Sequence, residues 1–190
     1  ESSSIAGVAV DESNGFIYYC RYTAGEIARR NLDGTNPVVL VGGQTFPSDI
    51  QVDPVAGIMV WGSGAGVRTA QLDGTSVQVV NAGTNANGVA FSASMPGIAY
   101  TLETGSALRR SAADGSADGL VLGGLFNPQG LDVLVDQHVV TAVAVGQGGV
   151  LHRRGPQRLR AHAQPQAQPA AAPGRPAVEH RQQPLAPHLQ

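Results

Sequence analysis

The sequence is poor in several residue types, and each scarcity excludes a class of protein or site. Only one of the 190 residues is cysteine, so the chain cannot hold an internal disulfide. Cys20 lies in the apolar run FIYYC, where we expect a buried, unreactive thiol. No stretch approaches the ~18 consecutive apolar residues that a membrane helix needs, so we expect no membrane span.

Histidine is absent from residues 1–136, and lysine is absent from the whole chain. Without histidine, no Ser-His-Asp or Cys-His catalytic set can be assembled in this region. The glycine clusters, such as WGSGAG at 61–66, lack the Gly-Lys-Ser/Thr of a phosphate-binding loop. We therefore expect no catalytic residue, no cofactor and no enzyme activity.

What the chain does contain is an internal repeat of about 40 residues. Its clearest marker is an Asp-Gly pair followed by a hydroxyl residue and then a Val/Leu run. This marker occurs at Asp33-Gly34, Asp73-Gly74 and Asp114-Gly115. The repeats span 5–46, 47–86, 87–127 and, with a weaker pattern, 128–154.

Each repeat has the composition of four β-strands. In the first repeat, apolar residues alternate at Val8 and Val10, and the runs FIYYC, EIARRNL and PVVLVGG follow. Asp-Gly between two such runs predicts a hairpin, with a type I′ turn that has positive φ at both central residues. Four strands in about 40–45 residues is the unit of a β-propeller. We therefore predict an all-β fold, a partial β-propeller of about three and a half four-stranded blades.

Acidic residues are spread through the repeats instead of being gathered at one point. Asp33, Asp73 and Asp114 belong to the hairpin turns. Asp11 and Asp53 open the turn after the first strand of their repeats, where an Asp side chain bonds its own backbone. A calcium site needs several oxygens that converge, so we expect no metal site.

The first repeat also carries a family resemblance. Its stretch AVDESNGFIYYCRYTAGEIARRNLDGT, residues 9–35, resembles the YWTD repeats of low-density-lipoprotein-receptor class B propellers. The NHL and SMP-30 propellers share parts of this pattern. The resemblance covers about residues 5–150 and implies a non-catalytic propeller that binds protein or glycan in an extracellular or cell-envelope setting.

The chain departs from that family in two respects. The positions of the YWTD tetrad read YYCR at 18–21, VWGS at 60–63 and YTLE at 100–103, so the family's Asp is missing each time. The family's propeller closes with six blades, whereas only three and a fraction are visible here. Open blade edges would remain, and these predict self-association.

The composition changes towards the end of the chain. Residues 1–136 are acidic overall, whereas residues 137–190 are basic and hold all five histidines. From Arg153 the sequence is rich in Pro, Ala, Gln and Arg, too poor in apolar residues to offset the entropy of ordering it. We predict propeller repeats over 1–150 and an irregular or disordered tail over 151–190.

The tail has no aromatic residue, so we expect no nucleic-acid binding. The chain begins with Glu1 and no signal-peptide pattern, which indicates a processed or truncated chain.

The candidate binding residues follow the second strand of each repeat. Arg21, Tyr22, Ser63 and Glu103 lie at or just after the ends of these strands, in loops expected to gather on one face. Loops on a rigid scaffold are where binding residues concentrate.

Three hypotheses for the function remain open at this point. The first is a non-catalytic propeller segment that binds protein or glycan. The second is an enzyme of the SMP-30-like or lyase-like propeller group, which the missing histidines disfavour. The third is a structural subunit whose open blade edges join neighbouring chains.

Overall fold

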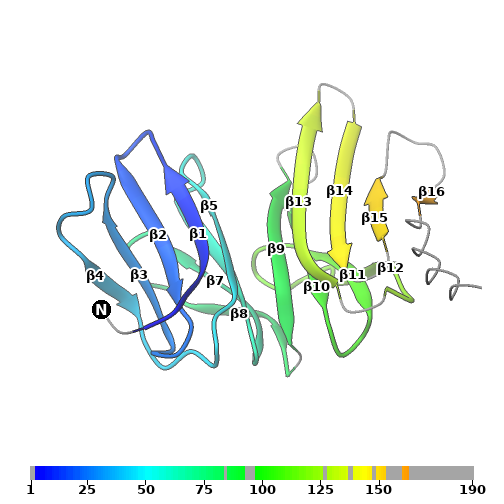
Figure 1. Ribbon diagram of the computed structural model, residues 1–190, viewed down its shortest axis with the longest axis horizontal. Coiled ribbons are helices and arrows are strands. Elements are labelled where there is room, and N and C mark those ends of the chain that lie inside the picture. Colours follow the sequence, from blue (N-terminus) through cyan, green and yellow to red (C-terminus); the bar gives the residue numbers. More distant parts are fainter. Residues whose placement is uncertain are drawn as a thin grey trace, which may run out of the picture.

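The computed structural model describes residues 3–83, 85–92, 97–125, 128–136, 139–146, 149–152 and 160–162, and in these ranges every regular element is a β-strand. The strands form four sheets, the first to fourth blade, each with four antiparallel strands in chain order (Figure 1). The first blade comprises β1 (Ile5–Asp11), β2 (Phe16–Arg21), β3 (Glu26–Asn31) and β4 (Val38–Val41); the second β5 (Asp49–Asp53), β6 (Ile58–Ser63), β7 (Gly66–Gln71) and β8 (Gln78–Ala82); the third β9 (Ala86–Ser92), β10 (Gly97–Leu102), β11 (Ala107–Ser111) and β12 (Gly119–Leu122); the fourth β13 (Pro128–Asp136), β14 (Val139–Gly146), β15 (Gly149–His152) and β16 (Arg160–His162).

This arrangement confirms the all-β fold of consecutive four-stranded blades. The fourth blade is more complete than the sequence predicts, because β15 and β16 give it four strands. β16 lies inside the segment predicted to be irregular, so that prediction does not hold for Arg160–His162. Other residues after 152 lie outside the described residues, and the division at residue 150 stays a prediction. Within the described ranges, no helix has the length and apolar character to cross a membrane.

The Asp-Gly pairs lie in the hairpins between the third and fourth strands, but the turn type differs from the predicted one. Gly34 has φ +84°, whereas Asp33 is not among the residues with positive φ. The backbone N–H of Gly34 donates to the Asn31 carbonyl at 2.9 Å, and the Asn31 N–H donates to the Thr35 carbonyl at 3.0 Å. This is a three-residue loop that ends in one left-handed glycine.

The aspartate of each pair stabilises this loop through its side chain. Asp33 Oδ1 accepts hydrogen bonds from the backbone N–H of Thr35 at 2.9 Å and from its hydroxyl at 2.6 Å. Asp73 accepts the same two bonds from Thr75 at the same distances. These bonds hold the pKa of both carboxyls below the usual range. The hydroxyl residue recurs after Asp-Gly because it is the partner of the aspartate.

The hydrophobic core lies between blades. β1, β5, β9 and β13 contact one another in turn and form the innermost strands. Between the first and second blades, Tyr18 and Ile27 pack with Ile50 and Trp61 in one buried cluster. A second cluster joins the second and third blades, and a third cluster joins the third blade to Leu131 of β13. Most of the burial therefore depends on the stacking of sheet on sheet.

The strand register defines equivalent positions in the first three blades. On the second strand these are Tyr19, Trp61 and Tyr100; on the first strand, directly opposite them, they are Val8, Ile50 and Val89. Cys20 is adjacent to Tyr19 and completely buried, as expected. Burial, with a smaller effect of nearby Asp49, raises the pKa of the Cys20 thiol to about 12.

Candidate functional site

One side of the blades carries the turns after each second strand together with the segments that join one blade to the next. We call this side the crossover face and define it by residues 22–25, 42–48, 64–65, 83, 85, 103–106 and 123–125. Backbone hydrogen bonds tie the two kinds of segment together. Gln44 N–H donates to Gly25 at 2.8 Å, and Gly64 N–H donates to Thr45 at 2.7 Å. Glu103 N–H donates to the Asn85 carbonyl at 2.9 Å in the same way.

Tyr22 is the aromatic residue among the four candidates, and it lies on this face. The residue is 39% exposed, and its ring stacks on that of Phe46 with centroids 5.1 Å apart and an interplanar angle of 30°. Phe46 belongs to the segment between β4 and β5 and is 54% exposed. Its φ of +47° lies in the left-handed region, which is rare and unfavourable for a large side chain. The structure therefore presents two stacked aromatic rings to solvent, one from each of two chain segments.

Arg21 ends β2 directly beside Tyr22. Its Nη1 forms an ion pair with Glu26 Oε2 at 2.5 Å across the β2–β3 turn. Both side chains are partly exposed, so this pair contributes little to stability, about 0–1 kcal/mol. The pair does place a guanidinium and a carboxylate next to the aromatic rings.

The other two candidates differ from each other in exposure. Ser63 is buried, and its hydroxyl donates to the Gly66 carbonyl at 3.0 Å and accepts from Ala65 N–H at 3.3 Å. Ser63 therefore closes the β6–β7 turn and offers no surface to a partner. Glu103 is exposed, and its Oε2 lies 3.4–3.5 Å from the side-chain amides of Asn87 and Asn85. These long contacts leave its carboxylate accessible.

Sequence reasoning missed Phe46, which is a full member of the site. Its signal was an aromatic residue outside every expected strand, in the segment QTFPSD between two repeats. A large apolar residue in such a segment can be buried beneath the loop or exposed to solvent, and the sequence does not show which of the two occurs. Among the described residues, no three His, Cys, Asp or Glu side chains come together as a possible metal site.

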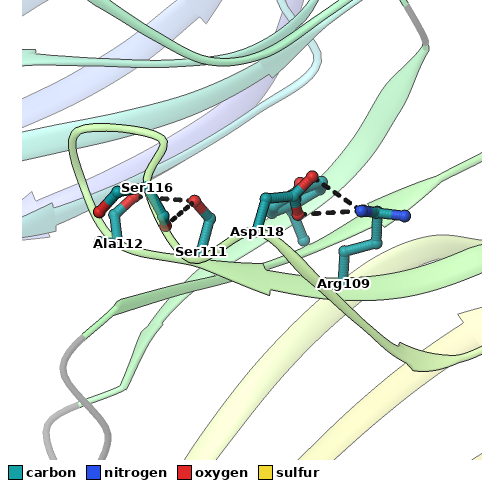
Figure 2. A network of polar contacts seen from close by, with 6 residues as sticks. Arg109, Ser111, Ala112, Ser116 and Asp118 are labelled. Atoms are coloured by element: carbon teal, nitrogen blue, oxygen red, sulfur yellow. Dashed lines mark hydrogen bonds and ion pairs between the residues drawn. The ribbon is translucent and has the colours of Figure 1, made fainter.

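A polar network joins three segments of the third blade (Figure 2). Arg109 binds Asp118 through two hydrogen bonds, at 3.0 Å from Nε and 2.8 Å from Nη2. The buried Tyr100 donates its hydroxyl proton to Asp118 Oδ1 at 2.6 Å. In the same view, Ser111 Oγ donates to the Ser116 carbonyl at 3.0 Å and pins the hairpin loop.

The network shifts the pKa of each member in the direction that its contacts require. Burial, and then the bond to Asp118, raises the pKa of Tyr100 to about 12. Burial alone would raise the pKa of Asp118, but the bonds from Arg109 and Tyr100 outweigh it and lower that pKa. The bond to Asp118 raises the pKa of Arg109 further above its usual value. Asp118 is therefore held as a carboxylate.

We expect Asp118→Asn to lower the free energy of unfolding at pH 7 by about 1–2 kcal/mol, because a charge-assisted pair is lost at a partly exposed site. The folded-state pKa of Asp118 is depressed, so its contribution is complete above the unfolded value of about 3.9 and disappears as pH falls through the folded value. Urea unfolding between pH 7 and pH 2 measures this. The free energies of unfolding of wild type and Asp118→Asn should become equal near pH 2. The exposed control Glu12→Gln should have the same free energy of unfolding as wild type at every pH.

Known proteins resemble this chain in fold but not detectably in sequence family. No protein-family model matches the chain, and no curated protein matches it in sequence. Solved structures do match. One is a nidogen/laminin complex, with a TM-score of 0.74 and 20% identity, covering 84% of this chain and 65% of that chain. The chain has the fold of a partial β-propeller.

Two bacterial structures have the same fold. Virginiamycin B lyase from Staphylococcus aureus matches with a TM-score of 0.69 and 13% identity, covering 88% of this chain and 58% of the lyase. An auxiliary nutrient binding protein from Bacteroides thetaiotaomicron matches with a TM-score of 0.65 and 10% identity, covering 83% of this chain and 42% of that protein. The chain therefore spans less than two thirds of each matched chain. The likeness is one of fold and includes both binding proteins and an enzyme.

Proposed function

We propose that the chain is a non-catalytic propeller segment that binds a protein or glycan partner through its crossover face. The single observation that carries this proposal is the Tyr22–Phe46 stack, because both rings are exposed and one has an unfavourable backbone conformation. Exposed aromatic rings with a polar rim are the features enriched where binding energy concentrates. The Arg21–Glu26 pair supplies that rim beside Tyr22.

The absence of histidine from residues 1–136 supports binding over catalysis, since no histidine base is present in the first three blades. The matched nidogen/laminin complex supports a protein partner, and the YWTD-like repeats support an extracellular or cell-envelope setting. The alternative, an enzyme like the matched lyase, would have to use a group other than histidine, and the accessible carboxylate on the described part of the crossover face is that of Glu103.

Binding should be measured on a glycan array and on immobilised laminin with three proteins: the wild-type chain, a Tyr22→Ala/Phe46→Ala variant and a Val55→Ala control. Val55 is an exposed apolar residue in the β5–β6 turn, outside the crossover face. For any probe that binds wild type, the double variant should raise the dissociation constant at least about 10-fold, as expected for lost aromatic anchors.

The control should bind as wild type does, and all three proteins should keep the same Trp61 fluorescence, since the changed residues are exposed. A double variant that binds like wild type would contradict the proposal. Chemical turnover of a bound probe would favour the enzyme alternative.

A further inference from the structure

The Tyr22–Phe46 stack depends on an unfavourable backbone conformation at Phe46. A φ of +47° is unfavourable for a large side chain, and Pro47 disfavours it further, because the residue before a proline prefers an extended conformation. Residues in such conformations persist where the surrounding structure over-determines them, and they concentrate at binding sites. The contacts on either side of Phe46 must therefore hold it in place.

Backbone hydrogen bonds hold the chain on both sides of Phe46. On the N-terminal side, the carbonyl of Thr45 accepts from the backbone N–H of Gly64 at 2.7 Å. On the C-terminal side, the backbone N–H of Ser48 donates to the carbonyl of Gly62 at 2.9 Å. Both glycines belong to the second blade, at β6 and the turn that follows it. The ring of Phe46 is therefore carried by a segment that is fixed to the second blade.

Gln44 joins this segment to the structures on both sides of it. Its backbone N–H donates to the carbonyl of Gly25 at 2.8 Å, in the turn that begins with Tyr22. Its side-chain Oε1 accepts from the indole N–H of Trp61 at 3.0 Å, and its Nε2 donates to the carbonyl of Gly42 at 2.9 Å. Trp61 is completely buried, and a buried indole N–H needs the partner that Gln44 supplies. Gln44 therefore connects both halves of the aromatic stack to the core between the first two blades.

Trp61 differs from the aromatic residues at the equivalent positions in where its polar atom finds a partner. The hydroxyl of Tyr19 accepts from Arg30 Nη2 on β3 at 3.0 Å. The hydroxyl of Tyr100 donates to Asp118, which lies between β11 and β12. Both of these bonds stay within one blade, whereas the indole N–H of Trp61 reaches the segment that precedes its blade. The tie to the crossover face is therefore a property of the tryptophan at this junction and not of the repeat.

We propose that Gln44 is a positioning residue for the crossover face: held by the buried Trp61, it keeps the Tyr22–Phe46 stack assembled before a partner binds. The inference rests on the proposed function for the identity of the binding surface, and it adds how that surface is formed. A preformed surface avoids the loss of affinity that arises when only a fraction of the molecules is competent to bind. The junction of the first two blades is thereby coupled to binding, although Trp61 itself is buried.

The first test needs no partner and measures nuclear Overhauser effects between the rings of Tyr22 and Phe46 in the full chain. Gln44→Ala and Trp61→Phe break the same hydrogen bond from opposite ends, and Trp61→Phe keeps an aromatic ring in the core. Each should lower the intensity of the inter-ring cross-peaks at least about 3-fold, because the net loss of one hydrogen bond shifts an equilibrium by that order. Far-ultraviolet circular dichroism checks that both variants remain folded.

Tyr100→Phe is the matched control for these two variants. It removes the hydroxyl donor at the equivalent position of the third blade, where the bond goes to Asp118. It should lower the stability to urea but leave the inter-ring cross-peaks at their wild-type intensity, which separates positioning from a general loss of stability. An unchanged inter-ring signal in either Gln44→Ala or Trp61→Phe, or an equal loss in Tyr100→Phe, would overturn the proposal.

The second test measures the binding of immobilised laminin. Where laminin binds wild type, Gln44→Ala should raise the dissociation constant about 3- to 10-fold. The same change should have no further effect in a chain that carries Phe46→Ala, because Gln44 acts through Phe46. A further loss in that background would overturn the positioning role. Laminin that does not bind wild type, or that binds Phe46→Ala as tightly, contradicts the proposed function alone, and the inter-ring signal then decides the present inference.

Discussion

Trp61→Ala is expected to lower the free energy of unfolding by about 3–5 kcal/mol, which is a large part of the stability of a small domain. Trp61 is completely buried in the cluster between the first and second blades. Its indole N–H donates to Gln44 Oε1 at 3.0 Å, so the same residue anchors the segment that crosses between the blades. Truncation would leave a cavity and an unsatisfied amide oxygen at the same junction.

Urea denaturation followed by far-ultraviolet circular dichroism measures this change, because Trp61 is the only tryptophan and its fluorescence is lost in the variant. Tyr22→Ala serves as the matched control, since it removes an aromatic ring from the surface and should cost less than about 1 kcal/mol. A Trp61→Ala midpoint close to that of the control would mean that the first two blades do not stack as described.

Gly66→Ala is expected to have an effect of similar size, about 3–5 kcal/mol, for a backbone reason. Gly66 begins β7 with φ +99°, and a Cβ there would lie 2.1 Å from the Asn81 carbonyl oxygen of β8. An alanine must therefore move one strand away from its neighbour.

Gly15→Ala is the control that separates this clash from the cost of positive φ. Gly15 has φ +73°, but nothing lies within 4 Å of its Cβ position, so about 1–2 kcal/mol is expected. The two variants should be compared in the same urea titration with Trp61 fluorescence as the signal. An equal loss of unfolding free energy in the two variants would show that β8 does not lie close against β7 at Gly66.

Much of the fold could be predicted because the pattern that signals it is local and repeated. The Asp-Gly pairs, the hydroxyl residue after them and the alternating apolar strands all lie within a single blade. The type of turn was not predicted correctly, because it depends on the backbone bonds between Asn31 and Thr35. β16 was missed because Arg160–His162 has no apolar alternation and forms its strand only by pairing with β15.

The candidate site was less predictable, because it depends on which side chains the loops turn outwards. Tyr22 is exposed, whereas the hydroxyl of Ser63 turns back into its own hairpin. Phe46 meets Tyr22 only because the crossing segment is tied to the β2–β3 turn through Gln44 and Gly25. Contacts of this kind arise between segments about 20 residues apart and leave no mark in a local pattern.

The central claim is that the blades stack on one another, and that the segments joining one blade to the next are hydrogen-bonded to the turns that follow the second strands. Amide hydrogen exchange, followed residue by residue by nuclear magnetic resonance, tests it most directly. The reporters are the amides of Gln44, Gly64 and Glu103, which lie outside the strands but donate to carbonyls of neighbouring segments at 2.7–2.9 Å. We predict that these three amides exchange as slowly as those in β2 and β6. Fast exchange at all three, with the strand amides still protected, would show blades that fold without stacking and would contradict the account.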